Sequence, residues 1–190
     1  MYSYSDVLKE TLIDGETLQN RVKELAAQLD KDYADKDVVL VCFLRGGVVF
    51  LVDLMREMKI PHKIEFMALS SYGVGKRESG GNVRISYAGS TDLKGKDIII
   101  VEDIIDSGNT LHAAIPLLLA QEPNSLCVCT LLNKSSRRTV EIPELKYVGF
   151  DIEDKFVYGY GLDLDDYFRN LSFIGVVDEK KLKEINSKQD

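Results

Sequence analysis

Three carboxylates lie within five positions directly after an apolar stretch of the sequence. Glu102, Asp103 and Asp106 follow the apolar run 98–101, which is typical of a buried strand. One carboxylate could cap the next helix, but capping does not account for three, and burying the others is costly unless they meet a binding partner. Because carboxylates repel phosphate, we expect Glu102 and Asp103 to bind hydroxyl groups or a divalent cation.

The next four residues, Ser107, Gly108, Asn109 and Thr110, are typical of the start of a helix. The first turn of a helix carries free N–H groups and a partial positive charge, and Gly108 would let an anion approach the backbone closely. Neither a P-loop nor a dinucleotide-binding glycine pattern occurs in the sequence. A phosphate site beside groups that bind hydroxyls or a cation indicates a phosphorylated sugar as the ligand.

The composition is that of one globular domain. The chain has 190 residues, of which 45% are apolar and 29% are charged, and its net charge at pH 7 is −7. This acidic balance disfavours a broad surface for nucleic acid or membranes, no apolar run is long enough to cross a bilayer, and the N-terminal residues lack the pattern of a signal peptide. We expect a cytoplasmic protein that binds neither nucleic acid nor a membrane.

Cysteine and histidine offer little chemistry. Cys42, Cys127 and Cys129 lie in apolar, strand-like runs, where cysteine is typically a small buried residue rather than half of a disulfide. His62 and His112 are far apart and have no companion cysteine. A histidine-rich zinc site and a Ser-His catalytic pair are therefore both disfavoured.

The elements that must position the reactive groups alternate between helix and strand. Apolar residues at helical spacing after Asp14 predict a helix over residues 15–34. Further helices are expected at 48–58 and 110–121, the latter kinked or shortened by Pro116. Strands are expected at 38–44, 63–70, 97–102, 125–132, 147–151 and 172–177. The polar residues that end the chain form a helix or a frayed tail.

This alternation predicts an α/β fold with a doubly wound, mostly parallel sheet. Ligands of such sheets bind at the carboxyl ends of the strands. The segments that can line one crevice there are 45–46, the long polar loop 71–83, 102–110, Lys134 and the residues after Asp151.

Five short motifs, in one order along the chain, resemble a known family. VEDIIDSGNT at 101–110 resembles the phosphoribosyl-pyrophosphate signature of type I phosphoribosyltransferases. The others resemble the 6-oxopurine branch, the hypoxanthine-guanine phosphoribosyltransferases: LRGG at 44–47, SSYG at 70–73, LLNK at 131–134 and DKFVYGYGLDLDDYFRNL at 154–171. The resemblance implies a single domain over residues 1–190 with the type I phosphoribosyltransferase fold. A small hood would be formed by the chain ends, mainly residues 1–15 and 151–190.

The resemblance implies roles on the sugar side of the site. Glu102 and Asp103 would hold the ribose hydroxyls near Mg²⁺, and Asp106–Thr110 would cradle the 5-phosphate. Asp106 would also lie near the purine N7 and act as the general base or acid that handles its proton. Residues Leu44, Arg45 and Gly46 match a pyrophosphate loop that contains a cis peptide bond. Many members have Lys where this chain has Arg45, which keeps the charge but changes the donor geometry.

Further roles concern the lid and the purine. Ser71 and Tyr72 match the doublet of a mobile lid, which would exclude water from the reacting sugar, and Arg169 matches a base that binds pyrophosphate. The predicted purine-binding residues are Lys134, Lys155, Phe156, Val157 and Asp163. Among them, Lys155 would donate to the exocyclic oxygen, Phe156 would stack on the base and the Val157 backbone would meet its edge, while Asp163 would also be associated with Mg²⁺.

The resemblance implies transfer of the 5-phosphoribosyl group from phosphoribosyl pyrophosphate to N9 of hypoxanthine or guanine. The products would be IMP or GMP and pyrophosphate, in purine salvage, made by a homodimer or homotetramer. One alternative is a non-catalytic regulator on the same fold that senses phosphoribosyl pyrophosphate, but the acidic composition offers no basic face for nucleic acid. Another is a phospho-acceptor receiver domain, which leaves the segment 154–171 unexplained.

Overall fold

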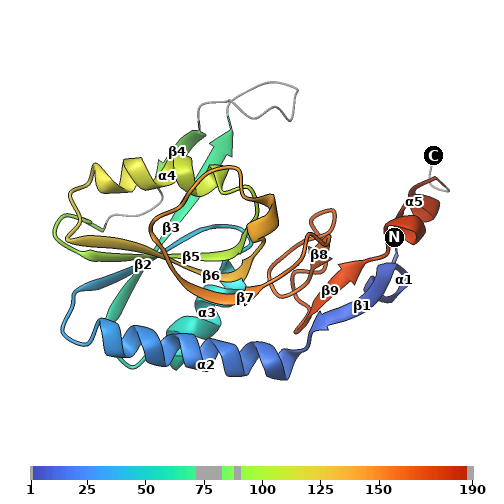
Figure 1. Cartoon of the computed structure of the whole chain (residues 1–190), viewed down its shortest axis with the longest axis horizontal. Coiled ribbons are helices and arrows are strands. Elements are labelled where there is room, and N and C mark those ends of the chain that lie inside the picture. Colours follow the sequence, from blue (N-terminus) through green and yellow to red (C-terminus); the bar gives the residue numbers. More distant parts are fainter. Residues whose placement is uncertain (1, 72–82, 88–90, 188–190) are drawn as a thin grey trace.

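The computed structural model contains a larger and a smaller β-sheet and describes residues 2–71, 83–87 and 91–187 (Figure 1). The strands are β1 (Leu8–Ile13), β2 (Val38–Leu44), β3 (His62–Ser71), β4 (Val83–Tyr87), β5 (Asp97–Ile105), β6 (Ser125–Asn133), β7 (Leu145–Asp151), β8 (Val157–Tyr158) and β9 (Ile174–Val177). The helices are α1 (Tyr4–Val7), α2 (Gly15–Asp32), α3 (Val48–Glu57), α4 (Asn109–Leu119), α5 (Glu179–Asn186) and the 3-10 turn η1 (Ser135–Arg137).

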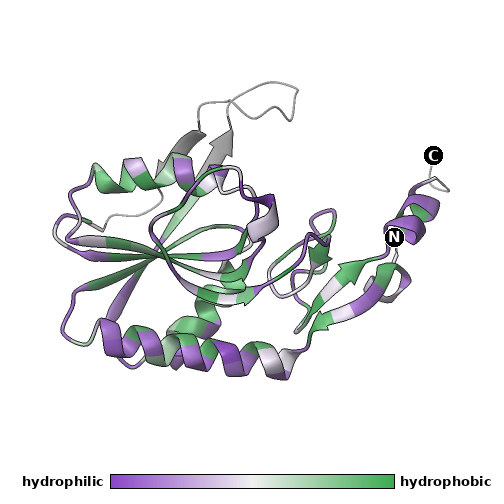
Figure 2. Ribbon diagram, viewed as in Figure 1, coloured by the Kyte–Doolittle hydropathy of each residue, from purple (hydrophilic) through white to green (hydrophobic). Residues whose placement is uncertain are grey.

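The larger sheet has the order β4-β3-β2-β5-β6-β7, in which β4 is antiparallel to β3 and the other neighbours are parallel. Helices α2 and α3 cover one face and α4 covers the other (Figure 1). Because side chains alternate along a strand, Leu40 and Cys42 of β2 pack with α2 and α3, whereas Val39 and Val41 pack with α4. Figure 2 shows the resulting concentration of apolar residues in the central strands. The predicted doubly wound, mostly parallel α/β fold is confirmed.

The smaller sheet joins the two ends of the chain. Its order is β1-β9-β8, and both pairs are antiparallel. A small separate core of Val7, Tyr158, Leu164 and Val177 holds it together.

Several predicted elements differ from the observed ones. The strand predicted at 97–102 continues because β6 pairs with it as far as Ile105. Asp103 therefore lies within β5, together with Glu102, rather than after the strand. Pro116 lies inside α4, which ends at Leu119, two residues before the predicted end. The middle of the predicted loop 71–83 lies outside the described residues.

The position of the site follows from the strand order. The chain runs outward from β2 to β3 and then returns to place β5 on the other side of β2, so the sheet order reverses between β2 and β5. Such a switch point leaves a crevice at the carboxyl ends of the two strands. Leu44, at the end of β2, and Ile105, at the end of β5, therefore lead into the same crevice.

Candidate active site

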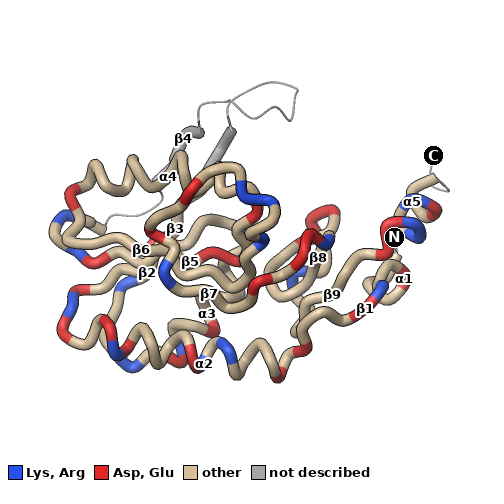
Figure 3. The backbone as a smooth tube through the Cα atoms, viewed as in Figure 1, with Lys and Arg blue, Asp and Glu red and all other residues tan. Residues whose placement is uncertain are grey.

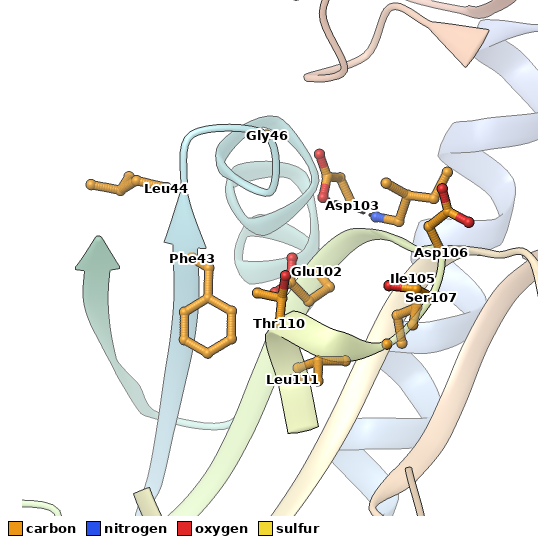
Figure 4. A pocket seen from close by; sticks show the side chains of 12 residues that line it. Phe43, Leu44, Gly46, Glu102, Asp103, Ile105, Asp106, Ser107, Thr110 and Leu111 are labelled. Carbon is orange, nitrogen blue, oxygen red and sulfur yellow. Dashed lines mark hydrogen bonds between the residues drawn. The ribbon is translucent and has the colours of Figure 1, made fainter. Parts of the chain in front are cut away.

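A pocket of about 350 Å³ lies at the carboxyl ends of β2 and β5 (Figure 4). From β2 and the turn after it, the pocket is lined by Phe43, Leu44 and Gly46. From β5, the following loop and the start of α4 come Glu102, Asp103, Ile104, Ile105, Asp106, Ser107, Gly108, Thr110 and Leu111. The structure thus brings together most of the residues predicted for the sugar phosphate.

Glu102, which is buried, and Asp103, which is partly buried, form an acidic pair at this pocket. Only 7% of Glu102 is exposed. Burial, together with the charge and hydrogen bonding of Asp103, raises the pKa of Glu102 well above its usual value. Burial also raises the pKa of Asp103, although the Ile104 N–H donates to Asp103 Oδ1 at 2.9 Å and opposes this effect. Charged carboxylates in this position need a cation or several hydrogen-bond donors beside them.

The turn after β2 lies directly against this pair. The peptide bond between Leu44 and Arg45 is cis. A Cβ atom built on Gly46 would lie 1.7 Å from Asp103 Oδ2, so any other residue there would collide with the carboxylate. Figure 4 shows the Asp103 side chain pointing toward Gly46. The backbone of the predicted pyrophosphate loop therefore touches the predicted ribose-binding acid.

The start of α4 has the geometry of an anion site. Gly108 precedes the helix with φ 87°, a left-handed conformation that glycine adopts readily. The helix begins at Asn109, whose N–H lies 3.3 Å from Ser107 Oγ. The free N–H groups of this first turn and the helix dipole favour a phosphate. Asn109 itself does not line the pocket; its side chain accepts a hydrogen bond from Thr139 Oγ1 at 3.3 Å.

Asp106 is joined to the segment after β7 by an arginine that the sequence did not single out. Arg137 Nε donates to Asp106 Oδ1 at 3.1 Å, and its Nη1 donates to Asp154 Oδ2 at 3.3 Å. These two carboxylates raise the pKa of Arg137. Lys134 is buried, and its Nζ lies 3.8 Å from Asp154 Oδ1. Arg137 follows the LLNK motif by three residues, but only the tertiary structure selects it over its neighbour Arg138.

A second group of charged side chains lies beside the turn after β2. Arg169 Nη2 lies 2.9 Å from Asp163 Oδ1 and 3.3 Å from Asp166 Oδ1, and Arg45 Nη2 lies 3.1 Å from the same Asp166 oxygen. Figure 3 shows acidic and basic stretches of backbone next to one another in the loop that follows β8. The charge of Arg169 lowers the pKa of Asp103 and that of Asp163 raises it, so both are near the acidic pair.

Three of the predicted purine-binding residues, Lys155, Phe156 and Val157, lie at or directly before the start of β8 in the smaller sheet. Lys155 Nζ lies 3.0 Å from Glu10 Oε1 and 3.7 Å from Glu153 Oε2. Phe156 is 46% exposed, which is unusual for a large aromatic ring, whereas Val157 is buried in β8. Of the predicted lid doublet, Ser71 ends β3, and Tyr72 lies outside the described residues.

The residues fit a magnesium ion that is shared with a ligand. Within residues 2–71, 83–87 and 91–187, no three acidic, histidine or cysteine side chains lie close enough to hold a metal by themselves. Mg²⁺ commonly takes only one or two protein carboxylates and completes its shell with water and phosphate oxygens. Glu102 and Asp103 in the pocket, with Asp163 nearby, offer that set of donors.

Comparisons with known proteins agree with this geometry. The family model described as phosphoribosyl transferase domain matches residues 10–165. Hypoxanthine phosphoribosyltransferase of Escherichia coli (strain K12) is 45% identical over 170 residues, covering 88% of this chain and 94% of the relative. Hypoxanthine-guanine phosphoribosyltransferase of Mycobacterium tuberculosis is 42% identical over 183 residues, covering 93% of this chain and 90% of the relative.

A solved structure agrees as well. The crystal structure of a hypoxanthine phosphoribosyltransferase from Staphylococcus aureus superposes with a TM-score of 0.88 at 43% identity, covering 95% of this chain and 97% of the other. The predicted family is therefore confirmed by the sequence relatives and by the fold. The chain belongs to the phosphoribosyltransferase family, in the branch of the hypoxanthine and hypoxanthine-guanine phosphoribosyltransferases.

Proposed function

We propose that this protein transfers the 5-phosphoribosyl group from phosphoribosyl pyrophosphate to N9 of hypoxanthine or guanine, a reaction of purine salvage. The observation that carries this proposal is the pocket in which the buried Glu102 and the partly buried Asp103 adjoin the start of α4. An acidic pair and a phosphate site that line the same pocket suit a ribose 5-phosphate. The relatives are named as transferases, which supports an enzyme rather than a non-catalytic sensor of the same sugar phosphate.

The donor would be held at three points. The N–H groups of residues 106–110 would bind the 5-phosphate, and Glu102 and Asp103 would accept hydrogen bonds from the ribose hydroxyls. The backbone of 44–46, with Arg169, would bind the pyrophosphate. Mg²⁺, held by Glu102, Asp103 or Asp163 together with substrate oxygens, would neutralise negative charge on the departing pyrophosphate.

The purine would be held by the smaller sheet, which we propose acts as a hood. The Lys155 ammonium has three N–H donors, so it can keep its contact with Glu10 and still donate to the exocyclic oxygen of the base. A donor at that position favours a 6-oxopurine over adenine, whose amino group also donates. Phe156 offers an exposed ring for stacking, and the Val157 backbone lies next to it.

The chemical step would then need one proton acceptor. N9 of the purine forms a bond to C1′ of the ribose while the bond from C1′ to the pyrophosphate oxygen breaks. The N7 proton of the base is lost in the same process, and the carboxylate of Asp106 would accept it. Arg137 Nε donates a hydrogen bond to one oxygen of that carboxylate and would hold the side chain in place for the transfer.

The experiment that tests this proposal supplies four bases in parallel. Purified protein is mixed with phosphoribosyl pyrophosphate and Mg²⁺, and nucleotide formation from hypoxanthine, guanine, xanthine or adenine is followed by ultraviolet absorbance. We expect nucleotide from hypoxanthine or guanine and none from adenine. Absence of nucleotide from both hypoxanthine and guanine, or efficient use of adenine, would refute the proposal.

A further inference from the structure

The turn that follows β8 is tied to the helices of the larger sheet by one buried tyrosine. We propose that Tyr160 is a positioning residue for the pyrophosphate side of the site, through its hydrogen bond to Asp53 on α3. This inference rests on the proposed function, because it concerns binding of phosphoribosyl pyrophosphate.

The hydrogen bond joins three segments that are distant in sequence. Tyr160 is 3% exposed, and its hydroxyl donates to Asp53 Oδ2 at 2.6 Å. Gln19 Nε2, from α2, donates to the same oxygen at 2.7 Å and lies 3.5 Å from the Tyr160 hydroxyl. Burial and the neighbouring carboxylate raise the pKa of Tyr160, so this hydroxyl remains a donor at neutral pH. Hydrogen bonds from a neutral group to a carboxylate are among the stronger ones in proteins.

The anchored turn rests on the predicted pyrophosphate loop without an intervening side chain. Tyr160 and Gly161 both have left-handed backbones, with φ 49° and 99°. A Cβ atom built on Gly161 would lie 2.3 Å from the carbonyl oxygen of Gly46, and one built on Gly46 would lie 1.7 Å from Asp103 Oδ2. Gly161 therefore contacts Gly46, and Gly46 contacts Asp103. If the turn at Tyr160 and Gly161 moved, the backbone at Gly46 and the side chain of Asp103 would have to move as well.

The same turn orients Arg169. The Gly161 N–H donates to the Arg169 carbonyl oxygen at 2.9 Å, and Arg169 Nη1 donates to the Gly161 carbonyl oxygen at 2.9 Å. Arg169 in turn pairs with Asp163. Fixing Tyr160 on Asp53 thus fixes both the backbone above Gly46 and the guanidinium predicted to meet the pyrophosphate.

Tyr158 supplies a matched control. It lies two residues earlier in the same segment, is fully buried, and its hydroxyl donates to the Tyr4 carbonyl oxygen at 2.9 Å. Its cluster contains Val7 of α1, Leu164 of the loop after β8 and Val177 of β9, and no residue of the turn after β2. Y158F removes a buried hydroxyl from the same sheet, so it measures how far the loss of such a hydroxyl alone changes the thermal midpoint and KM.

The experiment compares Y160F with Y158F in the active protein. We expect both to lower the thermal midpoint, but only Y160F to raise KM for phosphoribosyl pyrophosphate, by about tenfold, with KM for hypoxanthine changed by less than about twofold. The inhibition constant of pyrophosphate should rise in parallel. D53N keeps an acceptor oxygen for Tyr160, so it should retain more of the affinity than D53A, and this second pair tests the inference if Y160F fails to fold.

The outcomes separate the inference from the proposed function. If the unaltered protein forms no nucleotide, the proposed function fails and the inference fails with it. If that protein is active but Y160F and Y158F change KM for phosphoribosyl pyrophosphate by the same factor, Tyr160 is structural only. Equal affinity in D53N and D53A would overturn the inference in the same way.

Discussion

Asp106 is the side chain on which the proposed chemistry depends most. It lies in the pocket, and Arg137 donates to its carboxylate. Groups that transfer protons in the chemical step commonly contribute a factor of about 10² to 10⁴ in rate. We predict that D106N lowers kcat by at least about 100-fold. Because the amide preserves size, the dissociation constant of phosphoribosyl pyrophosphate, measured by calorimetry, should change by less than about threefold.

A carboxylate outside the pocket controls for the substitution itself. Asp32 accepts hydrogen bonds from Tyr147 and Lys146, and does not line the pocket. D32N should therefore leave kcat within about twofold of the unaltered protein. An unchanged kcat in D106N would remove Asp106 from the chemical step.

Lys155 is the residue for which we predict control of base affinity. K155M keeps the apolar stem and removes all three donors. We predict that KM for hypoxanthine rises by about tenfold or more, because the exocyclic oxygen loses its partner, while KM for phosphoribosyl pyrophosphate is unchanged. E10Q removes the charge that Lys155 meets but leaves the donor, so steady-state kinetics should show a smaller effect. If KM for hypoxanthine is the same in K155M and the unaltered protein, Lys155 does not donate a hydrogen bond to the base.

Strands β2 and β6 carry the three cysteines of the chain, Cys42, Cys127 and Cys129, and all three are buried. Burial, with the charges of Glu102 and Asp103, raises the pKa of Cys42 to about 12. A thiol reacts as its thiolate, so the native protein should not react with an aromatic disulfide reagent at pH 8. The unfolded protein should react at all three cysteines and release three equivalents of the reagent's thiol per chain. We predict that thiol reactivity appears only with unfolding, which circular dichroism monitors in parallel. Rapid labelling of the native protein would show that β2 or β6 is more open than its packing indicates.

The central strands and the edge strand β7 could be predicted from local pattern, whereas the edge strands β1, β4 and β8 could not. The apolar runs of β2 and β6 are buried on both faces, so composition alone marks them as strands. In β1, only Ile13 is buried, and the strand exists because Leu8 pairs with Val177 at the other end of the chain. No local pattern contains such a pairing.

The candidate site shows the same division. The residues from β5 into α4 could be predicted, because burying several carboxylates at the end of an apolar run is costly unless they bind a ligand. Arg137 and Asp53 could not, because each is defined by a partner far along the chain: Asp106 for one, and Tyr160 for the other. Local sequence specifies the chemical groups, whereas the tertiary structure selects the residues that orient them.

At the scale of the whole molecule, the two sheets meet around the pocket. The contacts that connect the segment after β7 to the loops of the larger sheet include Asp154 with Arg137, Asp166 with Arg45, and Gly161 with Gly46. Apart from Lys134, which follows β6, the residues proposed to bind the base lie directly before, in or after β8 of the smaller sheet, whereas those proposed to bind the sugar lie in β5 of the larger sheet or directly after it. This arrangement suits a reaction that joins two substrates. None of the described helices is both long and apolar enough to cross a membrane.

The most direct test of the central claim measures both products of one reaction. Phosphoribosyl pyrophosphate and hypoxanthine are incubated with the protein and Mg²⁺, and IMP and pyrophosphate are quantified by chromatography at several times. The proposed function predicts that they form in equal amounts, only when both substrates are present, and that D106N slows both equally. Pyrophosphate or inorganic phosphate released without a matching amount of IMP would contradict phosphoribosyl transfer to the purine.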